Sequence, residues 1–272
     1  MIYLGCSQWG IESFKECIYP ENAKPGDYLY YYSKEFNCVE LNPTYHDKVE
    51  REKLLIWKSK VNGAFKFCPK FPKTISHDNR LNNVQELTEE FINLVRVFEE
   101  NLGICFLQLP PNFHHSNLYL IDELLTFIDN RIKVNIEFRT DWLSRPDILR
   151  DGLEVLKKHK AGIVIEDDAE TIPYLNNIKI TNSSAFIRFE VTCLHIDYER
   201  INDWINMIKL WQDKGIKEVY FMIHFPDKAE SINIINFTRD NFVNKLGWNP
   251  DELKSQRCAN LKPGTRSVSR ED

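Results

Sequence analysis

The chain has 272 residues, of which 43% are apolar and 28% charged, and its formal net charge at pH 7 is −5. This composition is typical of a globular protein, and the acidic balance does not favour nucleic acid as a partner. No apolar run reaches the roughly 18 residues that span a bilayer. Met1 leads into an apolar run without a basic region or a cleavage site. We therefore expect a cytoplasmic protein without a signal peptide or a membrane partner.

The seven cysteines form no Cys-x-x-Cys pair. Four of them, Cys6, Cys38, Cys68 and Cys105, lie in or beside apolar runs. This pattern predicts small buried side chains in a reducing compartment, because metal and redox clusters need closer spacing.

Eight short apolar runs have the lengths of buried parallel strands. They are Ile2–Cys6, Phe36–Leu41, Ala64–Cys68, Gly103–Leu109, Ile132–Phe138, Gly162–Glu166, Ala185–Phe189 and Glu218–Ile223. Between most of them lie segments with helical periodicity. These are 27–34, 48–60, 84–99, 117–129, 146–159, 197–214 and 231–246. After the sixth run only 171–177 is available, so the helix there is expected to be irregular or missing.

Eight strands alternating with helices predict an α/β fold, a single (β/α)₈ TIM-like barrel over residues 1–253. A polar, flexible tail is expected over 254–272. A doubly wound open sheet is the alternative, and it would lack pairing between the first and last strands. Neither Gly-x-Gly-x-x-Gly nor a Walker A motif occurs in the chain.

The fifth run carries charge on one face. Because strand side chains alternate, Asn135, Glu137 and Arg139 share a face, opposite Val134 and Ile136. A carboxylate and a guanidinium at the end of an apolar run are costly to bury unless they are paired or used.

The same alternation places polar groups at the ends of the other runs. These groups are Glu40 and Asn42, Lys70 with His77 in the loop beyond it, Gln108, Asp167, Arg188 and His224. In a barrel that face points inward, and active sites lie at the carboxyl ends of the strands. We therefore expect one pocket there, built from most of the strands.

The mixture of charges suits a small polar ligand with an anionic, sugar-like or phosphate-like group, and acid/base chemistry. We assign proton handling to Glu137, Glu40, His77 and Asp167. Substrate binding is assigned to Lys70, Arg139, Arg188, Gln108, Asn42, Tyr45, His224 and the aromatic side chains of Trp9 and Trp142.

Two other function classes stay open. Glu40, His77, Glu137, Asp167 and His224 are acceptable ligands for a divalent metal, as in metal-dependent nucleic-acid-processing barrels. No His spacing supports such a site, so no metal or cofactor is assigned. A non-catalytic module that binds a ligand or a partner is the other class. A glycosidase is disfavoured, because Gln108 cannot act as a general acid at the end of the fourth run.

At these residues the chain resembles the YecE-like family, known as domain of unknown function 72, from Leu4 to about Asp227. The motifs that carry the resemblance are Gly5-Cys6-Ser7-Gln8-Trp9, Tyr19-Pro20, Val39-Glu40-Leu41-Asn42, Phe67-Cys68-Pro69-Lys70-Phe71-Pro72, Gln108-Leu109-Pro110-Pro111, Glu137-Phe138-Arg139 and Phe186-Ile187-Arg188-Phe189. The resemblance implies a TIM-like barrel and no particular reaction. The chain departs from the family pattern at Cys6, Gln8, Glu190 and His224, so the mouth differs chemically there.

Overall fold

The structure is a computed structural model that describes residues 1–11, 14–46, 48–139, 145–168, 179–226 and 229–249. Trp142, the 171–177 segment and the tail 254–272 lie outside the described residues, so the expectations for them stay predictions.

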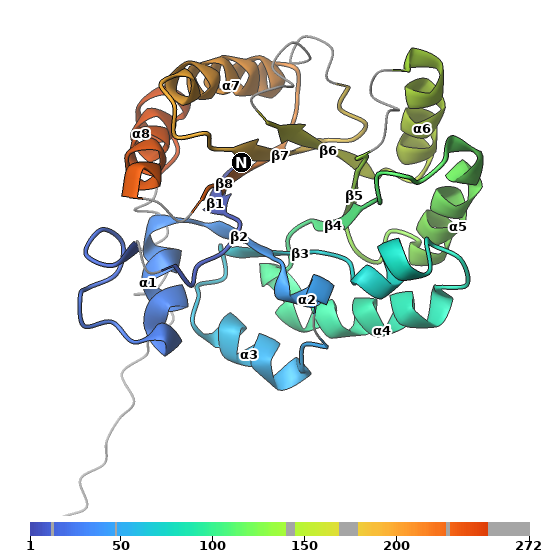
Figure 1. Ribbon diagram of the computed structural model, residues 1–272, viewed down its shortest axis with the longest axis horizontal. Helices are drawn as coiled ribbons and strands as arrows, with labels where there is room; N and C mark the ends of the chain where they lie inside the picture. The colour runs from blue at the N-terminus through green and yellow to red at the C-terminus, as the bar shows by residue number, and fades with distance from the viewer. Residues whose placement is uncertain (12–13, 47, 140–144, 169–178, 227–228, 250–272) are drawn as a thin grey trace, which may run out of the picture.

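All eight expected strands form, and each is buried. They are β1 (Ile2–Cys6), β2 (Cys38–Leu41), β3 (Lys66–Pro69), β4 (Cys105–Gln108), β5 (Val134–Glu137), β6 (Gly162–Asp167), β7 (Ser184–Glu190) and β8 (Glu218–His224). Their order in the sheet is β3-β2-β1-β8-β7-β6-β5-β4, and every ladder between neighbours is parallel. Because β1 pairs with β8 over five residues, the open-sheet alternative is wrong and the fold is a TIM-like barrel (Figure 1).

The sheet is nearly closed between β3 and β4. Two isolated parallel bridges join these strands, with hydrogen bonds from Gly103 N to the Phe67 carbonyl oxygen at 2.7 Å and from Phe71 N to the Phe106 carbonyl oxygen at 2.9 Å. A side chain at Gly103 would place its Cβ 2.9 Å from the Phe67 oxygen. Glycine therefore permits the close backbone approach that brings the two edges together.

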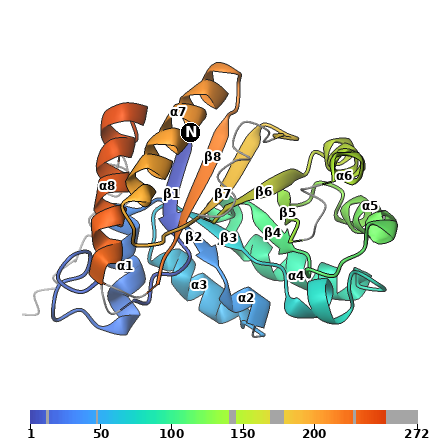
Figure 2. The ribbon, with the colours of Figure 1, turned by 45° about the horizontal axis from the view of Figure 1, so that its top comes forward.

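The expected helices surround the sheet (Figures 1 and 2). They are α1 (Tyr28–Glu35), α3 (Arg51–Ser59), α4 (Gln85–Val95), α5 (Leu118–Ile128), α6 (Pro146–Lys158), α7 (Ile196–Asp213) and α8 (Ala229–Leu246). A short helix that the sequence pattern did not predict, α2 (Pro43–His46), follows β2. No helix of the described part is long and apolar enough to cross a membrane.

The barrel interior has its own apolar layer, separate from the core between strands and helices. It consists of Tyr3, Cys38, Cys68, Ile104, Phe106, Val164, Phe186, Tyr220 and Met222. The rings of Tyr3 and Tyr220 stack with centroids 4.4 Å apart. Cys6, Cys38, Cys68 and Cys105 are buried and unbridged, as predicted. This filled layer closes the barrel below the carboxyl ends of the strands, so polar side chains above it form a floor rather than a channel.

Candidate functional site

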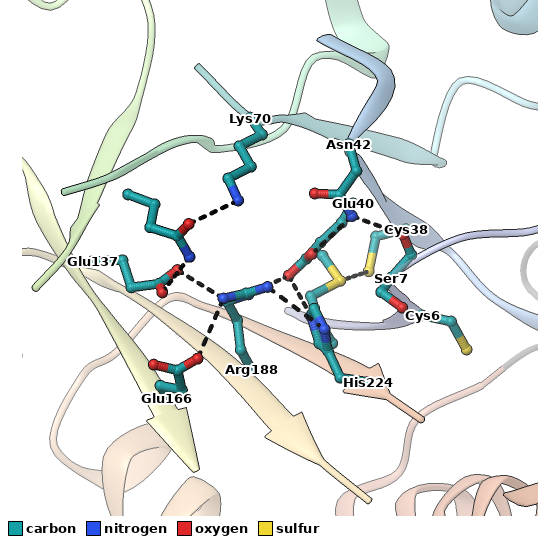
Figure 3. A network of polar contacts seen from close by, with 12 residues as sticks. Cys6, Ser7, Cys38, Glu40, Asn42, Lys70, Glu137, Glu166, Arg188 and His224 are labelled. Atoms are coloured by element: carbon teal, nitrogen blue, oxygen red, sulfur yellow. Dashed lines mark hydrogen bonds and ion pairs between the residues drawn. The ribbon is translucent and has the colours of Figure 1, made fainter. Parts of the chain in front are cut away.

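Polar side chains converge at the carboxyl ends of the strands (Figure 3). They are Glu40 from β2, Lys70 directly after β3, Gln108 from β4, Glu137 from β5, Glu166 from β6, Arg188 from β7 and His224 from β8. Neighbours in register, such as Gln108 with Glu137 and Glu166 with Arg188, present their side chains at the same height. We call these seven residues together with Arg139 the mouth network.

Arg188 is the centre of the mouth network. Its Nε donates to Glu40 Oε1 at 2.9 Å, and one Nη donates to Glu137 Oε2 at 2.8 Å. The same Nη lies 3.6 Å from Glu166 Oε1, and the guanidinium lies 5.6 Å from the centroid of the Phe106 ring. The Arg188 side chain is only 7% exposed. It therefore ties β2 to β5 across the barrel and has little capacity left for a ligand.

Glu40 is a fully buried carboxylate with three cationic or polar neighbours. His224 Nε2 lies 2.8 Å from the Oε1 atom that also accepts from Arg188, and Asn42 Nδ2 donates to Oε2 at 3.4 Å. Burial raises the pKa of Glu40, but Arg188 and His224 outweigh it and lower this pKa to about 2. Glu40 is therefore an ionised anchor over the whole physiological pH range.

Both oxygens of the Glu137 carboxylate also accept hydrogen bonds from other side chains of the mouth network. Its Oε1 accepts from Gln108 Nε2 and from Arg139 Nε, each at 2.6 Å, and its Oε2 accepts from Arg188. Arg139, which is 37% exposed, also donates from Nη2 to Glu166 Oε1 at 2.6 Å. The expected Glu137–Arg139 pair therefore forms, but Arg188 is the buried partner of this carboxylate. Three donors on one carboxylate favour a positioning role over proton transfer.

Lys70 differs from the two arginines. Its Nζ donates to the neutral Gln108 Oε1 at 3.0 Å and lies 4.2 Å from the centroid of the Tyr45 ring. It forms no ion pair with any described carboxylate, although it is only 8% exposed. Burial and the nearby Arg188 lower the pKa of Lys70 to about 8. Lys70 is thus a buried amine poised to lose its proton near neutral pH.

His77 lies beside Lys70 on the rim of the mouth. Its ring meets the Tyr45 ring edge-on at 5.5 Å, and its Nδ1 lies 2.8 Å from Ser76 Oγ. Burial, followed by the charge of Lys70, lowers the pKa of His77, so the imidazole is neutral at pH 7.

The prediction that Asp167 faces the mouth is wrong. Its carboxylate lies outside the sheet, 3.0 Å from the guanidinium of Arg200 and 2.6 Å from Trp204 Nε1, both in α7. Glu166, which the sequence reasoning missed, faces the mouth in its place. Both faces of β6 are apolar, and Glu166 and Asp167 lie next to each other at its carboxyl end. Side-chain alternation alone therefore could not decide which of the two acids points into the barrel. Burial, followed by the charge of Glu137, raises the pKa of Glu166.

Of the aromatic residues expected at the mouth, Tyr45 and Trp9 lie in the described part of the chain, and they occupy different places. Tyr45 lies in the mouth beside Lys70, whereas Trp9 packs edge-on against Trp57 of α3 with centroids 5.2 Å apart. Asn42 bonds to Glu40 and to the Ser7 carbonyl oxygen. No three His, Cys, Asp or Glu side chains of the described part are placed to hold a metal ion.

A cavity of about 400 Å³ opens at the opposite end of the barrel, near the starts of β5 and β7. None of the mouth network lines it. Lys133 on its wall pairs with Glu218 at 2.6 Å, and His159 lies 2.7 Å from Asp122. These two charged groups are therefore matched within the protein, and the mouth remains the better candidate for chemistry.

Three comparisons with known proteins agree with this architecture. The family model described as protein of unknown function DUF72 matches residues 3–256. UPF0759 protein YecE of Escherichia coli K12 is 31% identical over 140 residues, which are 51% of this chain and 48% of that protein. The match thus spans about half the length of the curated relative.

Two solved structures share the fold. A DUF72 family protein from Enterococcus faecalis V583 aligns with a TM-score of 0.72 at 16% identity, covering 92% of this chain and 96% of that one. A DUF72 family protein from Thermotoga maritima MSB8 aligns with a TM-score of 0.68 at 22% identity, covering 88% and 98%. Since the family model covers almost the whole described barrel, the chain belongs to the DUF72 family.

Proposed function

We propose that the protein is an enzyme that binds a small polar compound with an anionic group at the mouth and transfers protons to or from it. The observation that carries this proposal is that the three cationic side chains of the mouth, Arg188, Lys70 and Arg139, differ in how far they are paired with groups of the protein. Arg188 is ion-paired with the carboxylates of Glu40 and Glu137, whereas Lys70 has no carboxylate partner among the described residues. Arg139 keeps its Nη1 without a hydrogen bond in the described part of the chain. These two groups are available to a ligand.

Proton transfer is supported by a pair of groups whose pKa values move toward neutrality from opposite sides. The pKa of Lys70 is lowered to about 8 and the pKa of Glu166 is raised, and both residues belong to the mouth network. Such opposed shifts are typical of acid/base sites. Glu40 then serves as an ionised anchor for Arg188, Glu137 positions Arg188 and Arg139 through its hydrogen bonds, and His77 supplies a neutral base at the rim.

The test is anion binding measured by calorimetry and thermal shift, with inorganic phosphate and glycolate as probes. Arg139→Gln should weaken binding about tenfold or more, because a charge-assisted hydrogen bond is lost. Arg150→Gln on α6 is the matched control, since Arg150 is 71% exposed and pairs with its neighbour Asp151 rather than with the mouth network. Equal affinity in wild type and Arg139→Gln, or no binding of either probe to wild type, would overturn the proposal. No observation on the described residues favours metal-dependent nucleic-acid processing.

A further inference from the structure

We infer that Lys70 is a nucleophile, and that its Nζ forms an imine with a short anionic aldehyde or ketone, of which a 2-oxo acid is the simplest. This inference rests on the proposed function and names the substrate class for the same mouth. It goes further, because it requires a covalent bond to one particular atom.

The partners of Lys70 carry the argument. A buried lysine is usually held as an ammonium ion by a carboxylate. Here Nζ contacts an amide oxygen, Gln108 Oε1, and the face of the Tyr45 ring. Neither carries a full negative charge, so the amine can lose its proton without breaking an ion pair. Gln108 cannot be deprotonated, and its Nε2 is fixed on Glu137, so its oxygen orients the amine.

Electrostatics agree with this geometry. With a pKa of about 8 for Lys70, about a quarter of the amine is neutral at pH 7.5, against about one in a thousand for an ordinary lysine. Only the neutral form attacks a carbonyl carbon.

The anionic group of the substrate has a defined place. Lys70, Gln108, Glu137 and Arg139 form a continuous chain of hydrogen bonds of 3.0, 2.6 and 2.6 Å. Gln108 and Glu137 therefore link Lys70 to Arg139 within the mouth network. A compound with its carboxylate on Arg139 and its carbonyl at Lys70 matches both groups, whereas Arg188 is already paired with Glu40 and Glu137.

The reaction balances with the groups present. The lone pair of neutral Nζ forms the C–N bond, and the carbonyl oxygen takes a proton to give a carbinolamine. This intermediate loses its hydroxyl group as water, and the nitrogen keeps one proton, so ammonium and carbonyl give a protonated imine and water. His77 is placed to relay the proton, because it shares the Tyr45 ring with Lys70 and its Nε2 makes no hydrogen bond among the described residues.

The experiment is reductive trapping on wild-type protein, with glyoxylate and cyanoborohydride at pH 7.5 and peptide mapping by mass spectrometry. Lys73 is an internal control, because it lies three residues away and is 54% exposed. Lys70 should be modified at least about tenfold faster than Lys73, since a pKa of about 8 gives Lys70 a far larger neutral fraction than an ordinary lysine has. Glycolate, which has the anion but no reactive carbonyl, should slow labelling of Lys70 and leave Lys73 unchanged.

A second probe separates this inference from the proposed function. Acetaldehyde lacks the anion, so its trapping at Lys70 should be slower than that of glyoxylate in wild type and equal to it in Arg139→Gln. Glycolate binding without trapping at Lys70 would overturn the imine and leave the proposed function intact. Absence of glycolate binding, with Lys70 labelled no faster than Lys73, would overturn both.

Discussion

The mouth network predicts a large and pH-dependent effect on stability when Arg188 is replaced by methionine. The substitution keeps an unbranched side chain of suitable length and removes the charge between two carboxylates that are 0% and 1% exposed. Breaking a buried pair on one side typically costs about 3–5 kcal/mol. The lowering of the Glu40 pKa to about 2 gives a consistent figure, corresponding to about 3 kcal/mol of stability at neutral pH.

The sign of the pH dependence follows from this pKa. In wild type the contribution of Glu40 is fully present above its unfolded pKa near 4.3, and it is lost as pH falls toward 2. In Arg188→Met the Glu40 carboxylate stays buried but loses its guanidinium partner, so its pKa rises above the unfolded value. The variant should therefore gain stability as pH falls from 7 toward 5. The difference in stability between the variant and the wild type should become smaller over this range.

Thermal melts by circular dichroism measure both effects. At pH 7 the melting temperature of Arg188→Met should fall by about 6–20 °C, taking roughly 2–4 °C per kcal/mol for a chain of this size. Arg139→Met is the matched comparison, and it should lose only about 1 kcal/mol because its side chain is half-exposed and Glu137 keeps Arg188. A melting temperature equal to wild type for Arg188→Met, or a gap that stays constant from pH 7 to pH 5, would refute the reasoning.

Two further predictions concern the scaffold. Trp204→Phe removes the indole donor to Asp167 and should lower the free energy of unfolding by about 1–3 kcal/mol in urea melts, with anion binding at the mouth unchanged. Trp211→Phe should have the smaller effect, because Trp211 makes no hydrogen bond to an acid among the described residues, and the reverse order would contradict the outward placement of Asp167. Gly162→Ala would put a methyl group 2.2 Å from Asn135 Oδ1 and should cost about 1–3 kcal/mol in urea melts. Asn135→Ala should restore part of that loss in the double variant, and purely additive losses would show that the two side chains do not meet.

The amino-acid sequence by itself determined the barrel and most of the inward-facing residues. Eight apolar runs of strand length separated by helical periodicity admit few architectures, and buried parallel strands need both faces covered. Where only one strand face carries polar groups near the carboxyl end, alternation is sufficient. Glu40, Gln108, Glu137 and Arg188 were placed in this way, and their convergence required only that the sheet curl into a barrel.

Tertiary structure decided what these residues do to one another. The sequence left open which acid at the end of β6 points into the barrel, because each face of the strand ends in one. Contacts with Arg200 and Trp204 of α7 hold Asp167 on the outside of the sheet. Arg188 meets Glu40 across 148 residues of chain, so no local pattern could have identified its partner. Lys70 is set apart because no carboxylate of the described residues pairs with it, a property of the folded barrel. Side-chain periodicity fixes which way a residue points, but its pKa depends on charges and burial that only distant segments supply.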